Sequence, residues 1–209
     1  MKVSYAIPVC NEIKEIKRLT QFLIDTKNEQ DEIVILVDET NHTAEVRDYV
    51  NTFAEECIDQ NVHHAYHPLD NDFGTFKNYL NSLCSGDYIY QVDADEMLSD
   101  YVVRILPQVL AHNPVDKIRV PRINTVKGLT DEHVKKWRWH VDDKGRVNFP
   151  DYQTRIYKND PGIEWSGKVH EVITGCDSVS HFPREDEWCL IHDKDIARQE
   201  IQNELYSKL

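Results

Sequence analysis

The chain has 209 residues and carries 24 Lys and Arg against 37 Asp and Glu, which gives a formal net charge of −13. This length fits one domain, and a content of 40% hydrophobic and 29% charged residues excludes collagen-like, low-complexity and wholly disordered chains. The acidic balance argues against nucleic acid or an anionic membrane as the main partner, and a polyphosphate ligand would need a metal cation.

Strands and helices are predicted to alternate through the first 125 residues. Near-continuous apolar runs, typical of parallel strands buried on both faces, predict strands over residues 3–9, 32–38, 62–67, 87–93 and 117–123. Apolar residues three and four apart predict helices over residues 13–26, 43–58, 74–85 and 100–111. This alternation predicts an α/β fold with an open, Rossmann-like, doubly wound and mainly parallel sheet.

The pattern changes in the second half of the chain. Residues 130–150 are charged and aromatic without a clear period, which predicts a long loop or an irregular helix. Short strands are expected over residues 153–158, 178–181 and 188–192, and a final helix over residues 195–209. No repeat or linker divides the chain, so we expect a single domain.

Targeting and redox signals are few. No apolar run approaches the roughly 18 residues that a membrane span needs. The apolar start is too short, and too soon followed by Glu12, for a signal peptide. The five cysteines form no CxxC pair, as is typical of a reducing compartment. We therefore expect a cytoplasmic protein without a transmembrane segment.

The strongest local motif follows the predicted strand 87–93, where Asp93 and Asp95 flank Ala94. Ligands of doubly wound sheets bind beyond the carboxyl ends of the strands. Two carboxylates there supply the hard oxygen ligands that suit Mg²⁺ or Mn²⁺, which bridge diphosphate oxygens. The simpler alternative is a solvated acidic turn in which Asp95 or Glu96 caps a helix.

Two further strand ends carry polar groups. The first strand ends in Pro8 and Val9, and Asn11 and Glu12 follow with groups that suit a base or a ribose; the alternative is a plain turn with Asn11 as helix N-cap. The second strand ends in Asp38, whose carboxylate suits a base N–H or, alternatively, an Asx turn.

A possible phosphate site opens the predicted helix 74–85. Phe73 precedes Gly74, which permits close backbone approach, and Lys77 lies on the first turn with the helix N–H groups. The alternative is a surface lysine on an amphipathic helix. Later in the chain, acid–base and aromatic groups follow one another: Asp151, Trp165, His170, Glu171 and His192.

Taken in order, these segments resemble family 2 of the inverting glycosyltransferases, which have the GT-A fold. The resemblance rests on residues 7–12, 36–40, 72–78 and 86–96. Residues 153–157, residues 165–171 and His192 are similar to a subgroup that contains lipopolysaccharide-core sugar transferases and bacterial peptide S-glycosyltransferases. The resemblance covers residues 3 to 194.

The resemblance implies one GT-A domain over residues 1–209, with a nucleotide-sugar-binding half (1–125), an acceptor and catalytic half (126–194) and a C-terminal helix (195–209). It implies metal-dependent, inverting transfer of a sugar from a nucleotide-diphosphate donor, with a UDP-sugar favoured. The acceptor is expected to be a glycan, a lipid-linked molecule or a peptide.

Roles for single residues follow from the same resemblance. Donor binding falls to Pro8, Val9, Asn11, Glu12, Asp38, Phe73, Lys77, Asp93, Ala94 and Asp95. The Mn²⁺ or Mg²⁺ ligands would be Asp93, Asp95 and His192. Glu171 is favoured as the catalytic base and Asp151 is the second choice. Acceptor contacts are expected at Trp137, Trp139, Trp165 and His170.

Two other functions stay open at this point. A non-catalytic carbohydrate- or nucleotide-binding module would also use tryptophan rings. A sugar-phosphate nucleotidyltransferase would need a glycine-rich, cationic loop after the first strand, whereas residues 8–12 contain neither glycine nor a cation.

Overall fold

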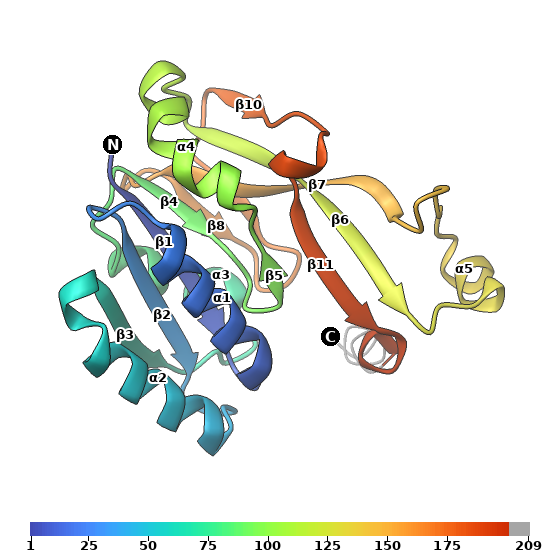
Figure 1. Ribbon diagram of the computed structural model, residues 1–209, viewed down its shortest axis with the longest axis horizontal. Helices are drawn as coiled ribbons and strands as arrows, with labels where there is room; N and C mark the ends of the chain where they lie inside the picture. Colours follow the sequence, from blue (N-terminus) through green and yellow to red (C-terminus); the bar gives the residue numbers. More distant parts are fainter. Residues whose placement is uncertain (201–209) are drawn as a thin grey trace.

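The computed structural model describes residues 1–200 and is built on one nine-stranded sheet (Figure 1). Its main path runs, in spatial order, through β3 (Val62–His67), β2 (Glu32–Asp38), β1 (Val3–Val9), β4 (Tyr88–Gln91), β7 (Val147–Lys158), β6 (Lys117–Lys127), β11 (Leu190–Asp195) and β5 (Glu96–Met97). A ninth strand, β10 (Val179–His181), pairs with β6. The predicted α/β fold with a mainly parallel sheet is confirmed.

Both faces of the central strands are covered, which explains their near-continuous apolar runs, since alternate residues of a strand face opposite sides. One face lies under α1 (Ile13–Thr26), α2 (Ala44–Glu56) and α4 (Asp100–His112). The other face lies under α3 (Phe73–Ser82) and a separate ribbon of β8 (Glu164–Ser166) and β9 (Val172–Thr174). Short 3₁₀ turns occupy Ile58–Gln60 and Asp186–Trp188.

The sheet joins the two halves of the sequence through β7. This strand lies antiparallel between β4 and β6, whereas β1 pairs in parallel with β2 and β4, and β6 pairs in parallel with β11. The carboxyl ends of β1, β2 and β4 therefore lie on the same edge of the sheet.

Most elements of the first half follow their predicted bounds. β1, β2, β3 and α1 coincide with the predicted ranges. α2 begins after Thr43, whose hydroxyl accepts a hydrogen bond from the Val46 amide, and Ser99 caps α4 in the same way. β4 ends at Gln91, two residues before the predicted end, because the chain turns there and the Glu96 amide donates to the Asp93 carbonyl.

The prediction for residues 130–150 is only partly right. A helix, α5 (Asp131–Trp137), occupies the start of this segment, but β7 already begins at Val147. Asn148, Pro150 and Asp151 hid the strand because these residue types are depleted in strands. Residues 196–200 are helical, and the remainder of the predicted helix 195–209 lies outside the described residues. Within residues 1–200, no helix has the length and apolar character needed to cross a bilayer.

The buried carboxylate of Glu32 lies at the start of β2, at the edge of the sheet opposite the carboxyl ends of β1, β2 and β4. Glu32 is 2% exposed and accepts hydrogen bonds from Lys2 Nζ (2.7 Å), Ser4 Oγ (2.6 Å) and both the amide and the hydroxyl of Ser85 (2.6 Å each). Burial alone would raise the pKa of Glu32, but these hydrogen bonds outweigh it and lower that pKa to about 2.

We expect Glu32→Gln to lower the free energy of unfolding by about 1–3 kcal/mol at pH 7, because the charge-assisted hydrogen bonds are lost. The folded-state pKa lies below the unfolded value of about 4.3, so this stabilisation is complete above that value and fades as the pH falls towards 2. Urea unfolding of both proteins from pH 7 to pH 3 measures the difference.

The matched control is Glu29→Gln, because Glu29 is exposed. It should leave the free energy of unfolding nearly unchanged at every pH. A difference between wild type and Glu32→Gln that stays constant down to pH 3 would contradict the assignment.

Candidate active site at the carboxyl ends of the strands

The turn after β4 is held by a buried arginine from β7. Arg155 is 4% exposed, and its Nη2 donates to Asp93 Oδ2 at 2.5 Å and to Glu96 Oε1 at 2.6 Å. Gln91 Nε2 donates to the other oxygen of Asp93 at 3.0 Å. Burial would raise the pKa of Asp93, but the charge of Arg155 and the more distant Lys77 outweigh it and hold that pKa well below its usual range.

Asp95 faces His192 of β11. His192 Nε2 lies 3.4 Å from Asp95 Oδ2, and the His192 ring is 4% exposed. Burial would raise the pKa of Asp95. A hydrogen bond and a positive charge from His192, both of which require a proton on Nε2, act with the more distant Arg198 to lower that pKa. The two predicted metal ligands from distant parts of the chain are therefore adjacent.

The tautomer of His192 follows from its neighbour Asn124 of β6. Asn124 Nδ2 donates to Asp151 Oδ2 at 2.9 Å, so the amide oxygen of Asn124 is the atom that faces His192 Nδ1 at 3.0 Å. Nδ1 must then carry the proton in the neutral ring, which leaves a lone pair on Nε2. Nε2 is buried and has no hydrogen-bond partner among the described residues.

A lone pair on His192 Nε2 directed at the Asp95 carboxylate calls for a cation between the two, or for a proton on the nitrogen. A neutral histidine whose other nitrogen is held by a hydrogen bond is the usual form of a metal-ligating histidine. Within residues 1–200, no three His, Cys, Asp or Glu side chains converge into a complete metal cage. Asp95 and His192 therefore stand as two candidate metal ligands at the end of β4.

Asp151 is fully engaged in hydrogen bonds. It accepts from Arg122 Nη2 (2.6 Å) and Nε (3.0 Å), from Asn124, and from Gln153 Nε2 (2.7 Å). Burial would raise the pKa of Asp151, but Arg122 and these hydrogen bonds outweigh it and lower the pKa. A carboxylate held in this way is a weak base, and the arrangement suits the positioning of Asn124 behind His192.

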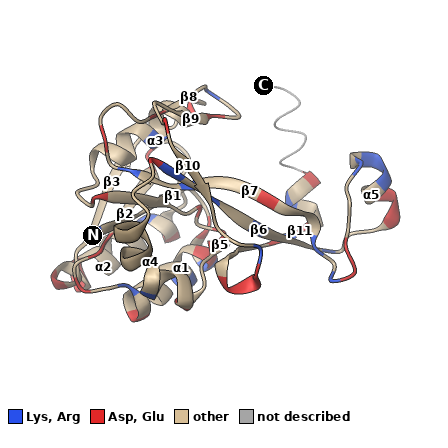
Figure 2. Ribbon diagram, turned by 90° about the horizontal axis from the view of Figure 1, so that it is seen from above, with Lys and Arg blue, Asp and Glu red and all other residues tan. Residues whose placement is uncertain are grey.

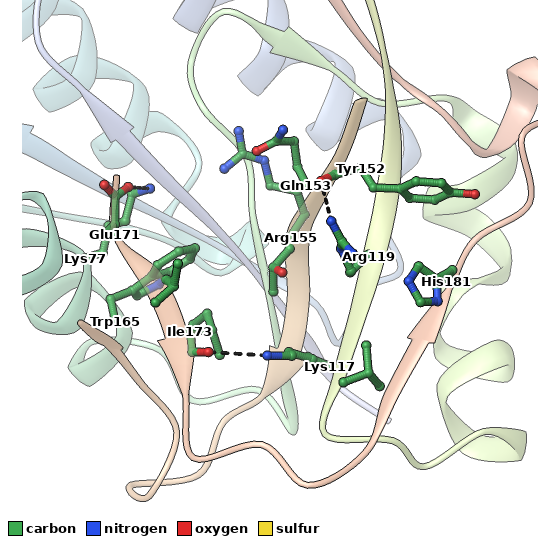
Figure 3. Close-up of a pocket in the computed structure, with 13 residues that line it drawn as sticks. Lys77, Lys117, Arg119, Tyr152, Gln153, Arg155, Trp165, Glu171, Ile173 and His181 are labelled. Atoms are coloured by element: carbon green, nitrogen blue, oxygen red, sulfur yellow. Dashed lines mark hydrogen bonds and ion pairs between the residues drawn. The ribbon is translucent and has the colours of Figure 1, made fainter. Parts of the chain in front are cut away.

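Glu171, the other predicted base, forms an ion pair with Lys77 of α3. Lys77 Nζ lies 2.5 Å from Glu171 Oε1 and 4.4 Å from the centre of the Trp165 ring (Figure 3). Lys77 is 7% exposed. Lys77 donates to Oε1, so Oε2 is the second acceptor atom of this carboxylate. Glu171 therefore combines a fixed orientation with an acceptor atom that Lys77 does not occupy.

Close backbone packing brings α3 and the β8–β9 ribbon together. A Cβ on Gly74 would lie 2.6 Å from the Gly167 carbonyl oxygen, so only glycine fits there. Asn78 donates to the Trp165 carbonyl and accepts from the Trp165 amide, both at 2.8 Å. These contacts place Lys77 beside Glu171 across 94 residues of sequence.

A cavity of about 460 Å³ opens beside this ion pair. Its walls come from α3, β6, β7, the ribbon and β10 (Figure 3). The lining residues are Lys77, Lys117, Arg119, Tyr152, Gln153, Thr154, Arg155, Trp165, Glu171, Val172, Ile173, Val179 and His181. Arg155 also binds Asp93, so one residue connects the cavity with the strand-end carboxylates.

The remaining donor-site predictions fall around the ends of β1 and β2. Asp38 accepts from the amides of Thr40 (3.1 Å) and Leu69 (3.2 Å) and from Asn41 Nδ2 (2.9 Å), as in the Asx-turn alternative. Glu12, rather than Asn11, is the N-cap of α1, and its side chain makes no capping hydrogen bond. The alternative of an Asn11 cap is therefore wrong.

The other predicted donor-site residues differ in their exposure to solvent. Pro8 is half-buried, Val9 and Ala94 are buried, and Asn11 is exposed. Phe73 begins α3, and its amide donates to the Lys168 carbonyl at 2.9 Å. Their nucleotide contacts stay predictions.

The aromatic residues predicted to bind the acceptor divide into two groups. Trp165 lines the cavity, although it is only 6% exposed and its Nε1 donates to the Tyr157 hydroxyl at 3.0 Å. His170 precedes Glu171 and has a left-handed backbone (φ 55°). The rings of Trp137 and Trp139 are in tilted contact at the end of α5, with centres 4.7 Å apart, and they do not line the cavity. Figures 1 and 2 show α5 standing apart from the body of the sheet.

Sequence reasoning missed the residues that hold the site together: Glu96, Arg122, Asn124, Arg155 and Arg198. Arg198 Nη2 lies 2.9 Å from Glu12 Oε1 and 3.6 Å from Asp95 Oδ2, and so joins two strand ends. A usable signal existed for Arg155 and Glu96, which lie within residues 153–157 and 86–96 of the family resemblance.

The profile of glycosyl transferase family 2 matches residues 4–176, most of the sequence. The chain belongs to this family. No curated protein matched the sequence. The family and the structural matches below also confirm the predicted GT-A fold.

Solved structures with the same fold have low sequence identity to this chain. Residues 1–349 of S. aureus TarS match with a TM-score of 0.65 at 14% identity, over 92% of this chain and 60% of that chain. The same fragment in complex with UDP-GlcNAc matches with a TM-score of 0.65 at 14% identity, over 93% of this chain and 59% of that chain. The mannosyltransferase PcManGT from Pyrobaculum calidifontis, in complex with GDP-Man and Mn²⁺, matches with a TM-score of 0.50 at 17% identity. This match covers 57% of this chain and 35% of that chain. The chain thus spans about 60% of the TarS fragment.

We expect Arg155→Gln to lower the free energy of unfolding by about 3–5 kcal/mol, because two carboxylates at the end of β4 lose their buried partner. Glu96 retains Arg122, at 2.9 Å, so the protein should still fold. Arg47→Gln, at an exposed arginine, is the control with the same loss of charge and little expected effect. Chemical denaturation measures both, and equal losses in the two variants would contradict the role of Arg155.

Proposed function

We propose that the protein is a metal-dependent, inverting glycosyltransferase that uses a nucleotide-diphosphate sugar, with a UDP-sugar as the favoured donor. The observation that carries this proposal is the pairing of Asp95 with the lone-pair nitrogen of His192. Arg155, which binds the neighbouring Asp93, connects this pair with the cavity that Glu171 lines. Family membership and the GT-A fold support the reaction class.

The donor side rests on the strand ends. TarS is found with UDP-GlcNAc and with UDP, and PcManGT with GDP-Man and Mn²⁺, which supports a nucleotide-sugar donor here as well. Asp38 and Glu12 lie where such a nucleotide would enter, at the ends of β2 and β1. Arg155 keeps Asp93 ionised and occupies its Oδ2 atom, and Gln91 donates to its other oxygen, so Asp93 suits a supporting role better than direct coordination.

A divalent cation would be held by Asp95 and His192. Such a cation neutralises the negative charge that develops on the leaving diphosphate. Asn124 fixes the His192 ring, and Asp151 fixes Asn124 in turn. Asp151 is therefore part of the site through its hold on Asn124, although it is unsuited to base catalysis.

Glu171 is the proposed base. In a single displacement, a carboxylate removes the proton of the acceptor hydroxyl as that oxygen attacks the anomeric carbon, which inverts its configuration. Lys77 holds Glu171 Oε1, so Oε2 is the atom that receives the proton. Lys77 contributes by fixing this carboxylate, and its field also reaches Asp93.

The acceptor class stays open between a glycan, a lipid-linked molecule and a peptide, as does membership of the lipopolysaccharide-core and peptide S-glycosyltransferase subgroup. A non-catalytic binding module is the second candidate, since Asp95 and His192 could bind a nucleotide without turnover. Release of UDP from UDP-sugars, with and without Mn²⁺, separates the two functions.

Mn²⁺ is expected to raise the affinity for UDP. We expect Asp95→Asn to reduce this Mn²⁺-dependent increase at least about tenfold, because a carboxylate ligand is lost. Isothermal titration calorimetry with UDP, at fixed Mn²⁺ and in EDTA, measures this gain. Asp100→Asn on α4 is the control, since Asp100 is exposed and pairs only with Arg104 within the described residues. An unchanged Mn²⁺ dependence in Asp95→Asn would rule out the proposed metal site.

We expect Glu171→Gln to lower turnover by about 10²–10⁴ while UDP affinity persists, because the amide retains the size of the carboxylate but cannot accept the proton. Compared with Glu171→Gln, Asp151→Asn should lower turnover less and thermal stability more, because Arg122 and Asn124 lose a charged partner. Near-normal turnover in Glu171→Gln together with an inactive Asp151→Asn would transfer the role of base to Asp151.

A further inference from the structure

The cavity beside Glu171 has a second, cationic wall. Lys117 and Arg119 lie two residues apart on β6, and both line the cavity. His181 of β10 pairs with Arg119 in the sheet and lines the same wall. Figure 3 shows this wall on the opposite side of the cavity from Lys77 and Glu171.

These two cations differ from the others in the cavity because no carboxylate neutralises them. Lys77 is paired with Glu171, and Arg155 is paired with two carboxylates. Among residues 1–200, Lys117 and Arg119 have no carboxylate within 4.0 Å. Their hydrogen bonds go to the carbonyl oxygens of Ile173 and Tyr152, each at 3.3 Å.

The nearest acid in the sequence is already occupied. Asp116 accepts from Lys158 Nζ at 2.7 Å, and its other oxygen accepts from the amides of Asp177 and Ser178. An ammonium has three N–H donors and a guanidinium has five, so most donors of Lys117 and Arg119 remain for a ligand. Within the described part of this chain of net charge −13, two cations without a carboxylate partner thus line one cavity.

The position of these cations separates them from the metal site. Arg119 precedes Asn124 by five residues on β6, which corresponds to about 16 Å along a strand. Asn124 contacts His192, so a diphosphate bound there would not reach Lys117 and Arg119. The ligand of the cationic wall is therefore a group other than the donor diphosphate.

We propose that the acceptor carries an oxyanion, a phosphate or a carboxylate, which Lys117 and Arg119 bind while its reacting hydroxyl lies at Glu171. This inference rests on the proposed function. A guanidinium and an ammonium on one strand face match the several oxygens of such a group. The cavity is also lined by two aromatic rings, Trp165 beside Lys77 and Tyr152 beside Arg119 (Figure 3).

The test compares three probes of similar size: glucose 6-phosphate, glucuronate and glucose. Each is titrated by ligand-observed NMR into the protein with saturating UDP and Mg²⁺, so that the donor site is already filled. We expect both anions to bind at least about tenfold more tightly than glucose, and this preference to weaken as salt rises. The stronger of the two anions identifies the oxyanion as phosphate or carboxylate.

Variants locate the binding. Lys117→Gln and Arg119→Gln should each weaken glucose 6-phosphate binding about tenfold, and the double variant should bind the three probes alike. Lys117→Arg should retain the preference because it retains the charge. Arg104→Gln, at an exposed arginine of α4, is the control with the same loss of charge. Thermal unfolding and UDP titration report whether each variant is folded.

The outcomes separate this inference from the proposed function. Equal binding of the three probes to the wild type, or an undiminished preference in the double variant, overturns the oxyanion site. Failure of UDP to bind, with glucose 6-phosphate binding that still depends on Lys117 and Arg119, overturns the donor assignment and leaves the oxyanion site standing.

Discussion

The arrangement of the site depends on one buried guanidinium. Arg155 comes from the strand that joins the two halves of the sheet, and it binds two carboxylates in the turn after β4. Without this cation, Asp93 and the fully buried Glu96 would be like charges held close together, which favours protonation of one of them. Because Arg155 holds Asp93, the neighbouring Asp95 is free to face His192.

A second constraint positions the proposed chemistry at the other end of the cavity. The approach of Gly74 to Gly167, and the paired hydrogen bonds between Asn78 and Trp165, fix α3 against the β8–β9 ribbon. Lys77 then reaches Glu171 from a rigid helix rather than from a loop. Buried pairing removes the conformational freedom that an exposed lysine would keep, so the carboxylate has one orientation.

The sequence could predict what is encoded locally. The apolar runs of β1 to β3 and the position of Asp93 and Asp95 at a strand end follow from periodicity within ten residues. His192 was associated with Asp95 only through the family resemblance, and the partner of Asp93 could not be predicted, because Arg155 lies 62 residues away. Their meeting depends on the strand order β4-β7-β6-β11, in which β7 enters antiparallel, and no local pattern specifies that order.

The distribution of charge gives the two ends of the site different tasks. Near the strand ends every buried cation is paired: Arg155 with Asp93 and Glu96, and Arg122 with Asp151 and Glu96. Paired charges hold a geometry, since breaking one leaves its partner buried and uncompensated. On the β6 wall, Lys117 and Arg119 donate to backbone carbonyls and Arg119 lies over the Tyr152 ring, and no carboxylate within residues 1–200 neutralises them. A cation that is positioned but not neutralised can bind an anion. The paired arginines therefore hold the framework of the site, whereas Lys117 and Arg119 form the wall that recognises a ligand.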